Sequence, residues 1–72
     1  MDALSAPLRL VVNGEPQDIA AANLAEALAV LDFADAVVAT ALNGAFVPKR
    51  KRAETALNDG DRIEIVAPRQ GG

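Results

Sequence analysis

Apolar and polar residues alternate near the start of the chain, over residues 8–12. Side chains of a strand point alternately to its two faces, so this pattern predicts a strand with one apolar face, formed by Leu8, Leu10 and Val12. The Asn13-Gly14 dipeptide that follows is typical of a two-residue hairpin turn, because both residue types tolerate a positive φ. The return strand runs to Ile19, and we expect it at a sheet edge because Pro16 has no backbone N–H to donate.

The pattern then changes to a helical period over residues 24–31. A helix places residues three and four positions apart on one face, and here a single apolar stripe is formed by Leu24, Leu28 and Leu31. Asn23 directly precedes this segment, and Glu26 lies three residues after Asn23. This spacing is that of a capping box at the start of a helix. In so small a domain the stripe is expected to face the core rather than a partner.

A second strand pair follows the helix. Residues 37–42 form an apolar run of strand length that ends in another Asn-Gly pair, Asn43-Gly44. One face of this run carries Val38, Thr40 and Leu42. The other face carries the smaller residues Val37, Ala39 and Ala41. Their small size predicts that no helix covers this face. A brief return strand, Phe46-Val47, is ended by Pro48.

Residues 49–52 are four consecutive cations, Lys-Arg-Lys-Arg. A charge run of this kind most often forms a solvated loop. The functional alternative is a docking patch for an acidic partner surface. Nucleic-acid binding is disfavoured, because no aromatic residues lie among the cations and the whole chain has a formal charge of −3.

The last elements bring the chain back to the sheet. Residues 53–57 predict a helical turn that places Leu57 in the core, and Asp59-Gly60 predicts a turn into the final strand. In that strand Ile63 and Ile65 face one way, whereas Glu64 and Val66 face the other.

These elements predict an α+β fold. One main helix covers one face of a mixed four- to five-stranded sheet, because no other large apolar partner is available. With the first and last strands parallel in the middle, this is the ubiquitin-like β-grasp arrangement. We expect a loose N-terminal extension over residues 1–7, the domain over residues 8–66, and a flexible tail over residues 67–72 that ends in Gly-Gly.

Composition limits the chemistry of the chain. Its 72 residues make one domain, and Phe33 and Phe46 are its only aromatic residues, so the core is expected to combine them with Leu, Ile and Val. The sequence has no Cys and no His, which removes disulfides, thiol nucleophiles, imidazole bases and the usual zinc ligands. No metal site is predicted. No apolar run is long enough for a membrane span and no secretory signal follows Met1, so a cytoplasmic protein is expected.

Several motifs together resemble a known family, the ThiS sulfur carriers of thiamine biosynthesis. The resemblance runs from about Leu8 to the end of the chain, and its motifs are Val12-Asn13-Gly14-Glu15, Ala41-Leu42-Asn43-Gly44, Val47-Pro48, Ala53-Glu54-Thr55, Leu57, the segment from Asp59 to Val66, and Gln70-Gly71-Gly72. Two positions depart from the family pattern. Arg52 stands where many relatives carry Trp, and residues 68–70 stand where an apolar residue is more usual.

The resemblance implies a carrier protein, not an enzyme, with no permanently bound cofactor. A ThiF-type activating enzyme would use ATP to convert the Gly72 carboxylate to an acyl-adenylate. Sulfur from a cysteine desulfurase or a similar donor would then give a thiocarboxylate, a C-terminal 1-thioglycine. A ThiG-type thiazole synthase would receive that sulfur.

Partner contacts are expected at the tail, whose glycines can thread a narrow channel, and on the uncovered face of the sheet. The tail would thread into the partner's site through Arg69, Gln70 and Gly71. The candidate docking residues are Val66, Ala39, Ala41, Phe46 and Arg52. Neither nucleic acid nor membrane is among the expected partners.

Other functions remain open for this sequence. The small subunit of molybdopterin synthase shares the fold, the Gly-Gly end and the thiocarboxylate, although the shortness of this chain and its final strand favour the thiamine branch. A sulfur carrier for another pathway, a ubiquitin-like modifier joined to lysines through Gly72, and a plain interaction module with an idle tail are the remaining alternatives.

Overall fold

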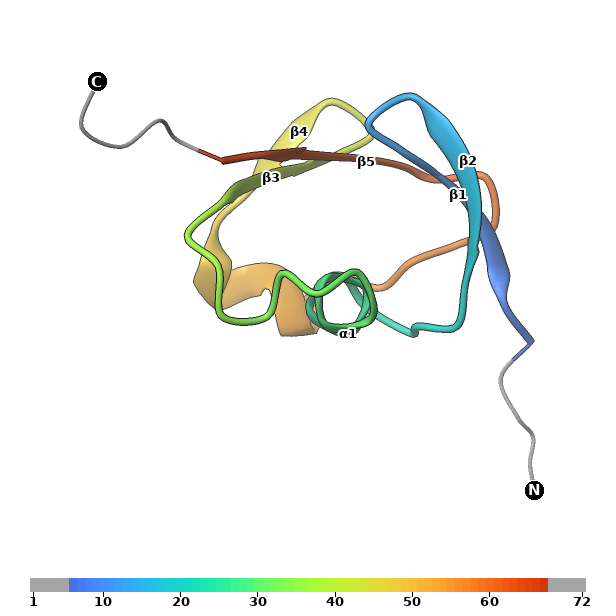
Figure 1. The fold of residues 1–72 in the computed structure, drawn as a ribbon, viewed down its shortest axis with the longest axis horizontal. Coiled ribbons are helices and arrows are strands. Elements are labelled where there is room, and N and C mark those ends of the chain that lie inside the picture. The colour runs from blue at the N-terminus through green and yellow to red at the C-terminus, as the bar shows by residue number, and fades with distance from the viewer. Residues whose placement is uncertain (1–5, 68–72) are drawn as a thin grey trace.

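Five strands form one mixed sheet in the order β2-β1-β5-β3-β4, and the helices lie on one side of it (Figure 1). The computed structural model describes residues 6–67. Most of the predicted N-terminal extension and of the predicted tail therefore lies outside the described residues. The elements are β1 (Leu8–Val12), β2 (Glu15–Ile19), α1 (Leu24–Val30), β3 (Ala39–Leu42), β4 (Ala45–Val47), the 3₁₀ helix η1 (Lys49–Glu54) and β5 (Arg62–Val66).

The last strand, β5, occupies the centre of the sheet. It pairs in parallel with β1, with Val12 opposite Ile63, and antiparallel with β3, with Leu42 opposite Ile63. The strand β2 lies at an edge, where the missing N–H of Pro16 costs no internal hydrogen bond. The predicted β-grasp fold, with its first and last strands parallel in the middle, is confirmed.

The helix α1 begins where the sequence predicts. The Oδ1 atom of Asn23 accepts a hydrogen bond from the Glu26 N–H at 2.9 Å, and Oε1 of Glu26 accepts one from the Ala22 N–H at 2.8 Å. The first bond satisfies a backbone donor that the first helical turn would otherwise leave free, and the second ties Glu26 to the residue before the N-cap. The helix ends at Val30, and Asp32 follows with a φ of 69°, which a helix cannot continue.

The core lies between α1 and the sheet. Inward-facing residues of β1, β5 and α1 supply most of it, and its members are Leu10, Val12, Ile19, Ala21, Leu24, Ala27, Leu28, Val47, Leu57, Ile63 and Ile65. Leu31 and Phe33 pack against its margin.

Three local expectations are corrected by the structure. Phe46 is not a core residue, because alternation along β4 buries its neighbour Val47 and leaves Phe46 69% exposed. The strand β3 begins at Ala39 instead of Val37, which is 77% exposed. The basic run is not a loop but begins η1, which covers Lys49–Glu54, so the helical turn predicted over residues 53–57 starts four residues earlier and ends at Glu54.

The two Asn-Gly turns do more than reverse the chain. Asn13 and Asn43 have φ values of 50° and 51°, and the glycines that follow also have positive φ, as a type I′ hairpin requires. The side chain of Asn13 accepts a hydrogen bond from the Ile65 N–H at 2.8 Å and donates one to the Ile65 carbonyl at 3.1 Å. Asn43 Oδ1 accepts from the Arg62 N–H at 2.9 Å. Both asparagine amides therefore extend the hydrogen-bond ladder of β5.

The core assignment predicts the cost of truncation. Leu28→Ala and Ile63→Ala should each lower the free energy of unfolding by about 2–5 kcal/mol, because both side chains are buried and each change leaves a cavity. Urea unfolding measures this cost. Val37→Ala, at an exposed position, is the control and should change stability by less than about 0.5 kcal/mol. An unmoved urea midpoint in Leu28→Ala or Ile63→Ala would contradict the assignment.

The Asn13 contacts predict a local effect on the end of β5. Asn13→Gly keeps the positive φ but loses both side-chain hydrogen bonds, so stability should fall by about 1–3 kcal/mol. Hydrogen exchange of the Ile65 amide should become faster. Asn13→Asp is the matched control, because it retains an acceptor for that amide and should keep more of its protection. Unchanged Ile65 exchange in Asn13→Gly would show that the side chain does not hold the strand.

Candidate functional site

The outer face of the sheet, on the side away from α1, carries an apolar patch where β5 ends. Val66 is 62% exposed and pairs with Ala39, while Phe46 is 69% exposed and pairs with Ala41. Alternation places all four side chains on one face, opposite the buried Ile65 and Val47. We call these four residues, Ala39, Ala41, Phe46 and Val66, the outer patch. It combines four of the five predicted docking residues in one surface.

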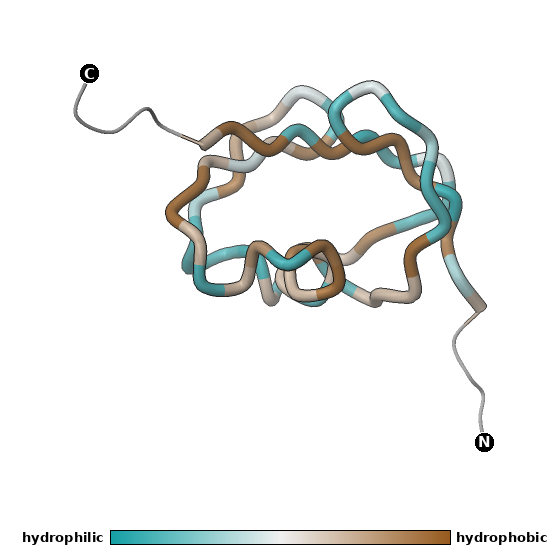
Figure 2. Tube along the Cα trace, viewed as in Figure 1, coloured by the Kyte–Doolittle hydropathy of each residue, from teal (hydrophilic) through white to brown (hydrophobic). Residues whose placement is uncertain are grey.

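The outer patch lies beside the point where the described chain ends. The strand β5 ends at Val66, and its apolar end is visible next to the start of the grey trace in Figure 2. The residues predicted to thread into a partner, Arg69, Gln70 and Gly71, and the predicted attachment point, Gly72, lie outside the described residues. Their roles therefore stay predictions. The outer patch nevertheless includes Val66, after which the segment with these four residues follows.

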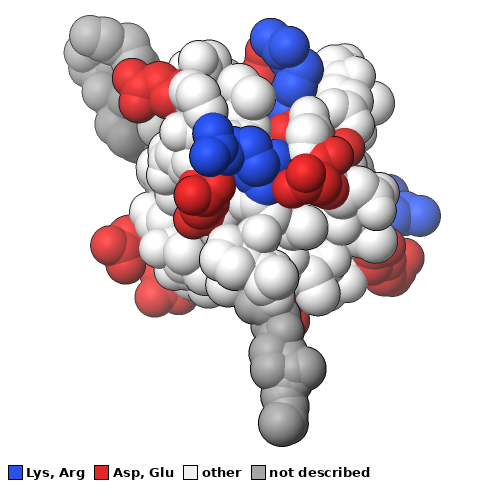
Figure 3. Space-filling view, turned by 90° about the vertical axis from the view of Figure 1, so that its right-hand side faces the viewer, with Lys and Arg blue, Asp and Glu red and all other residues white. Residues whose placement is uncertain are grey.

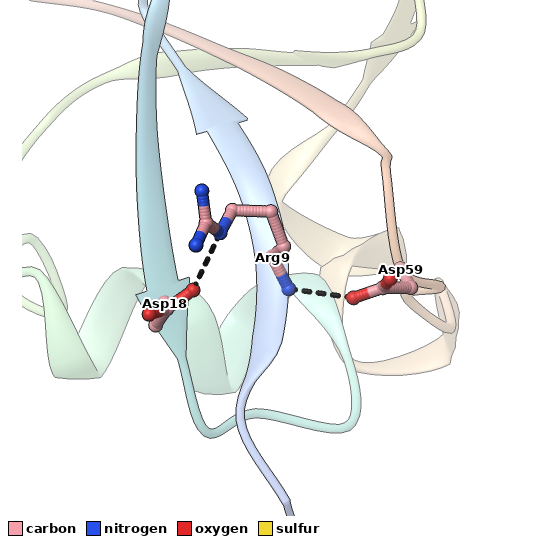
Figure 4. A network of polar contacts seen from close by, with 3 residues as sticks. All are labelled: Arg9, Asp18 and Asp59. Carbon is pink, nitrogen blue, oxygen red and sulfur yellow. Dashed lines mark hydrogen bonds and ion pairs between the residues drawn. The ribbon is translucent and has the colours of Figure 1, made fainter.

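The side of the molecule that carries β1 and β2 is polar by contrast. Arg9 Nε donates to Asp18 Oδ1 at 2.7 Å, and the Arg9 backbone N–H donates to Asp59 Oδ1 at 2.7 Å (Figure 4). Figure 3 looks onto this side of the molecule, where basic side chains lie between acidic ones. Such exposed pairs add little stability, because water screens both charges. The polar groups of Arg9 thus have hydrogen-bond partners within the chain, whereas Phe46 and Val66 of the outer patch are exposed to solvent.

Arg52 is the fifth predicted docking residue, and the structure corrects that prediction. Its side chain is 7% exposed and lies on the helix side of the sheet. Its Nε donates to Thr40 Oγ1 at 3.0 Å and its Nη2 donates to the Val38 carbonyl at 2.7 Å. Thr40 in turn donates to the Val47 carbonyl at 2.8 Å. Arg52 therefore joins η1 to β3 and offers almost no surface for docking.

Sequence reasoning missed this internal role for a specific reason. A run of four cations does not say which one turns inward. The available signal was Thr40, a polar residue in an otherwise apolar strand, since a buried hydroxyl needs a hydrogen-bond partner. The side-chain roles of Asn13 and Asn43 were also missed, because the turn geometry explains both residues without them.

Within residues 6–67 no three acidic side chains gather where they could hold a metal ion. No helix among the same residues is long and apolar enough to cross a membrane. What residues 6–67 present on the outer face of the sheet is a small apolar surface beside the end of β5.

Comparison with known proteins assigns the family. The ThiS family model matches residues 10–72. The crystal structure of a thiamine biosynthesis protein (ThiS) from Geobacter metallireducens has a TM-score of 0.76 and 33% identity, and the match covers 90% of this chain and 100% of that one. A thiazole synthase from Paramagnetospirillum magneticum is 42% identical over 66 residues, which are 90% of this chain but only 20% of that protein. The chain thus spans about a fifth of the length of that relative. Because the family model covers most of the sequence and the fold agrees, the chain belongs to the ThiS family.

Proposed function

We propose that this protein is a sulfur carrier that delivers sulfur for thiazole formation in thiamine biosynthesis, as a thiocarboxylate on Gly72. The observation that carries the proposal is the match of the ThiS family model to residues 10–72, which include Gly71 and Gly72. The Paramagnetospirillum protein supports the choice of partner. In that relative, a segment similar to this chain is joined to a longer protein named thiazole synthase.

The proposed chemistry begins at the terminal carboxylate. A carboxylate is a poor electrophile until one of its oxygens becomes part of a good leaving group. An activating enzyme must therefore first convert that oxygen to a leaving group. The Gly72 oxygen attacks the α-phosphate of ATP, pyrophosphate leaves and an acyl-adenylate forms. A cysteine persulfide of the sulfur donor then attacks the carbonyl carbon, and AMP leaves. Cleavage of the resulting S–S bond by a second thiol releases the thiocarboxylate.

The described residues support a passive part for the domain in this sequence of steps. The chain has no Cys and no His, so neither the usual thiol nucleophile nor an imidazole base can come from it. The six residues after Val66 reach about 20 Å when extended, which is enough to enter a partner's site while the domain stays outside. The outer patch supplies apolar area for docking beside the start of this reach.

The two relatives also bear on the alternative functions of this chain. The thiamine biosynthesis protein and the thiazole synthase both favour the thiamine branch over a molybdopterin synthase subunit. A lysine-linked modifier and an interaction module with an idle tail gain no support from either relative.

The proposal predicts a defined covalent product. After incubation with a ThiF-type activating enzyme, ATP and a sulfur donor, intact-protein mass spectrometry should show a gain equal to one oxygen replaced by sulfur, localised to Gly72. Deletion of Gly71 and Gly72 should abolish the gain without unfolding the domain. Gly72→Ala should be charged slowly, because a methyl group crowds the activating site. No gain, with an enzyme shown to charge its own carrier, would refute the proposal.

The outer patch predicts where thiazole synthase binds. Phe46→Glu should weaken binding by about tenfold or more, because it places a charge in the centre of the apolar contact. Val37→Glu is the matched control: Val37 is equally exposed and apolar but lies outside the outer patch. Both proteins should keep their urea midpoints. Equal losses of affinity in the two variants, measured by calorimetry, would show that the patch is not the docking surface.

A further inference from the structure

A second surface lies on the opposite side of the domain from the outer patch. The helices α1 and η1 meet there and leave a pocket of about 250 Å³. Its walls are mostly small apolar side chains, with two cations at one side, and its lining residues are Ala25, Leu28, Ala34, Lys49, Arg52 and Ala53. None of these residues belongs to the outer patch or to the tail, so the proposed carrier function makes no use of the pocket.

The positive charge of this pocket has no acidic partner in the described chain. Arg52 is more than nine-tenths buried, and its two recorded hydrogen bonds go to neutral oxygens, Thr40 Oγ1 and the Val38 carbonyl. Within residues 6–67 the ion pair that forms is between Arg9 and Asp18, so neither Arg52 nor Lys49 has a described carboxylate within 4.0 Å. A buried charge without a counter-charge is costly, and an anion that reaches it is correspondingly favoured.

The donors that remain suit one planar anion. A guanidinium group has five N–H donors, and the recorded contacts use those of Nε and one on Nη2. Lys49 adds an ammonium group at the exposed rim. The alanine walls leave room for the methylene groups that precede a side-chain carboxylate. Arg50 and Lys51 are also exposed on η1 and add positive charge near the pocket, which suits a segment with more than one acidic residue better than a single small ion.

We propose that the α1–η1 pocket binds a Glu or Asp side chain from an acidic segment of a partner protein. The pocket receives one carboxylate between Arg52 and Lys49, and neighbouring acidic residues of the segment lie along η1. Four of the seven Lys and Arg residues of the chain lie in η1, although the net charge of the chain is −3. The site is separate from the outer patch, so a partner bound here leaves both that patch and the tail free. The proposal does not depend on the sulfur-carrier function.

Nuclear magnetic resonance titration of the full chain tests the site. The probe is a short capped peptide that alternates Glu and Ala, and its Gln-Ala counterpart is the neutral control. The acidic peptide should give saturable shifts at the amides of Ala25, Ala34 and Ala53, together with the Arg52 Nε signal. The neutral peptide should give none. Absence of saturable shifts with the acidic peptide would overturn the proposal.

Two matched pairs of variants separate the pocket from diffuse charge attraction. Lys49→Ala should raise the dissociation constant about tenfold, whereas Arg50→Ala removes the same charge outside the lining and should raise it no more than about threefold. Ala53→Leu fills the pocket while keeping every charge and should abolish binding. Ala29→Leu, at an exposed position of α1 outside the pocket, should not.

Three results would contradict the proposal. Equal effects of Lys49→Ala and Arg50→Ala, or unchanged binding by Ala53→Leu, would show that η1 attracts anions without using the pocket. Acetate that shifts the same signals as strongly as the peptide, at equal carboxylate concentration, would assign the pocket to a free small carboxylate instead of a protein segment.

Discussion

Hydrogen bonding to the backbone of β5 is the interaction on which the rest of this structure depends. This strand lies in the centre of the sheet, with β1 on one side and β3 on the other. Asn13 and Asn43 add side-chain hydrogen bonds where the neighbouring strands turn away. One face of β5 contributes Ile63 and Ile65 to the core, so the strand is held by packing as well as by its ladder. The C-terminal tail follows directly from β5, so the position of this central strand determines where the tail begins.

The two faces of the sheet differ in their surroundings, and only the inner one is covered. The inner face is covered by α1 and supplies the core, whereas the outer face leaves Phe46 and Val66 in contact with water. Exposed apolar side chains contribute little to the stability of the folded monomer, and their position beside the start of the tail is the basis for proposing that they dock a partner. Substitutions in the outer patch therefore separate partner binding from folding, which substitutions in the core cannot do.

Much of the fold could be predicted because several local signals agree. The Asn-Gly pairs require positive φ, the Asn23 and Glu26 pair marks a helix start, and alternation assigns the inner face of β1 and β5. The inward turn of Arg52 could not be predicted, since a run of like charges carries no usable period. Phe46 fits both a core position and a docking position in the sequence, because a strand of three residues is too short for alternation to decide between them. The chemistry at Gly72 comes from the family resemblance alone, because glycine has no side chain from which a role could be inferred.

The most direct test of the carrier function follows the sulfur atom itself. The thiocarboxylate form of this chain, made with isotopically labelled sulfur, is mixed with thiazole synthase, its deoxyxylulose phosphate substrate and a nitrogen-containing co-substrate that supplies the ring nitrogen, in the presence of unlabelled sulfide. The account predicts that the thiazole product carries the label and that the chain returns to its free carboxylate. An unlabelled product, with the label retained on the chain, would contradict it.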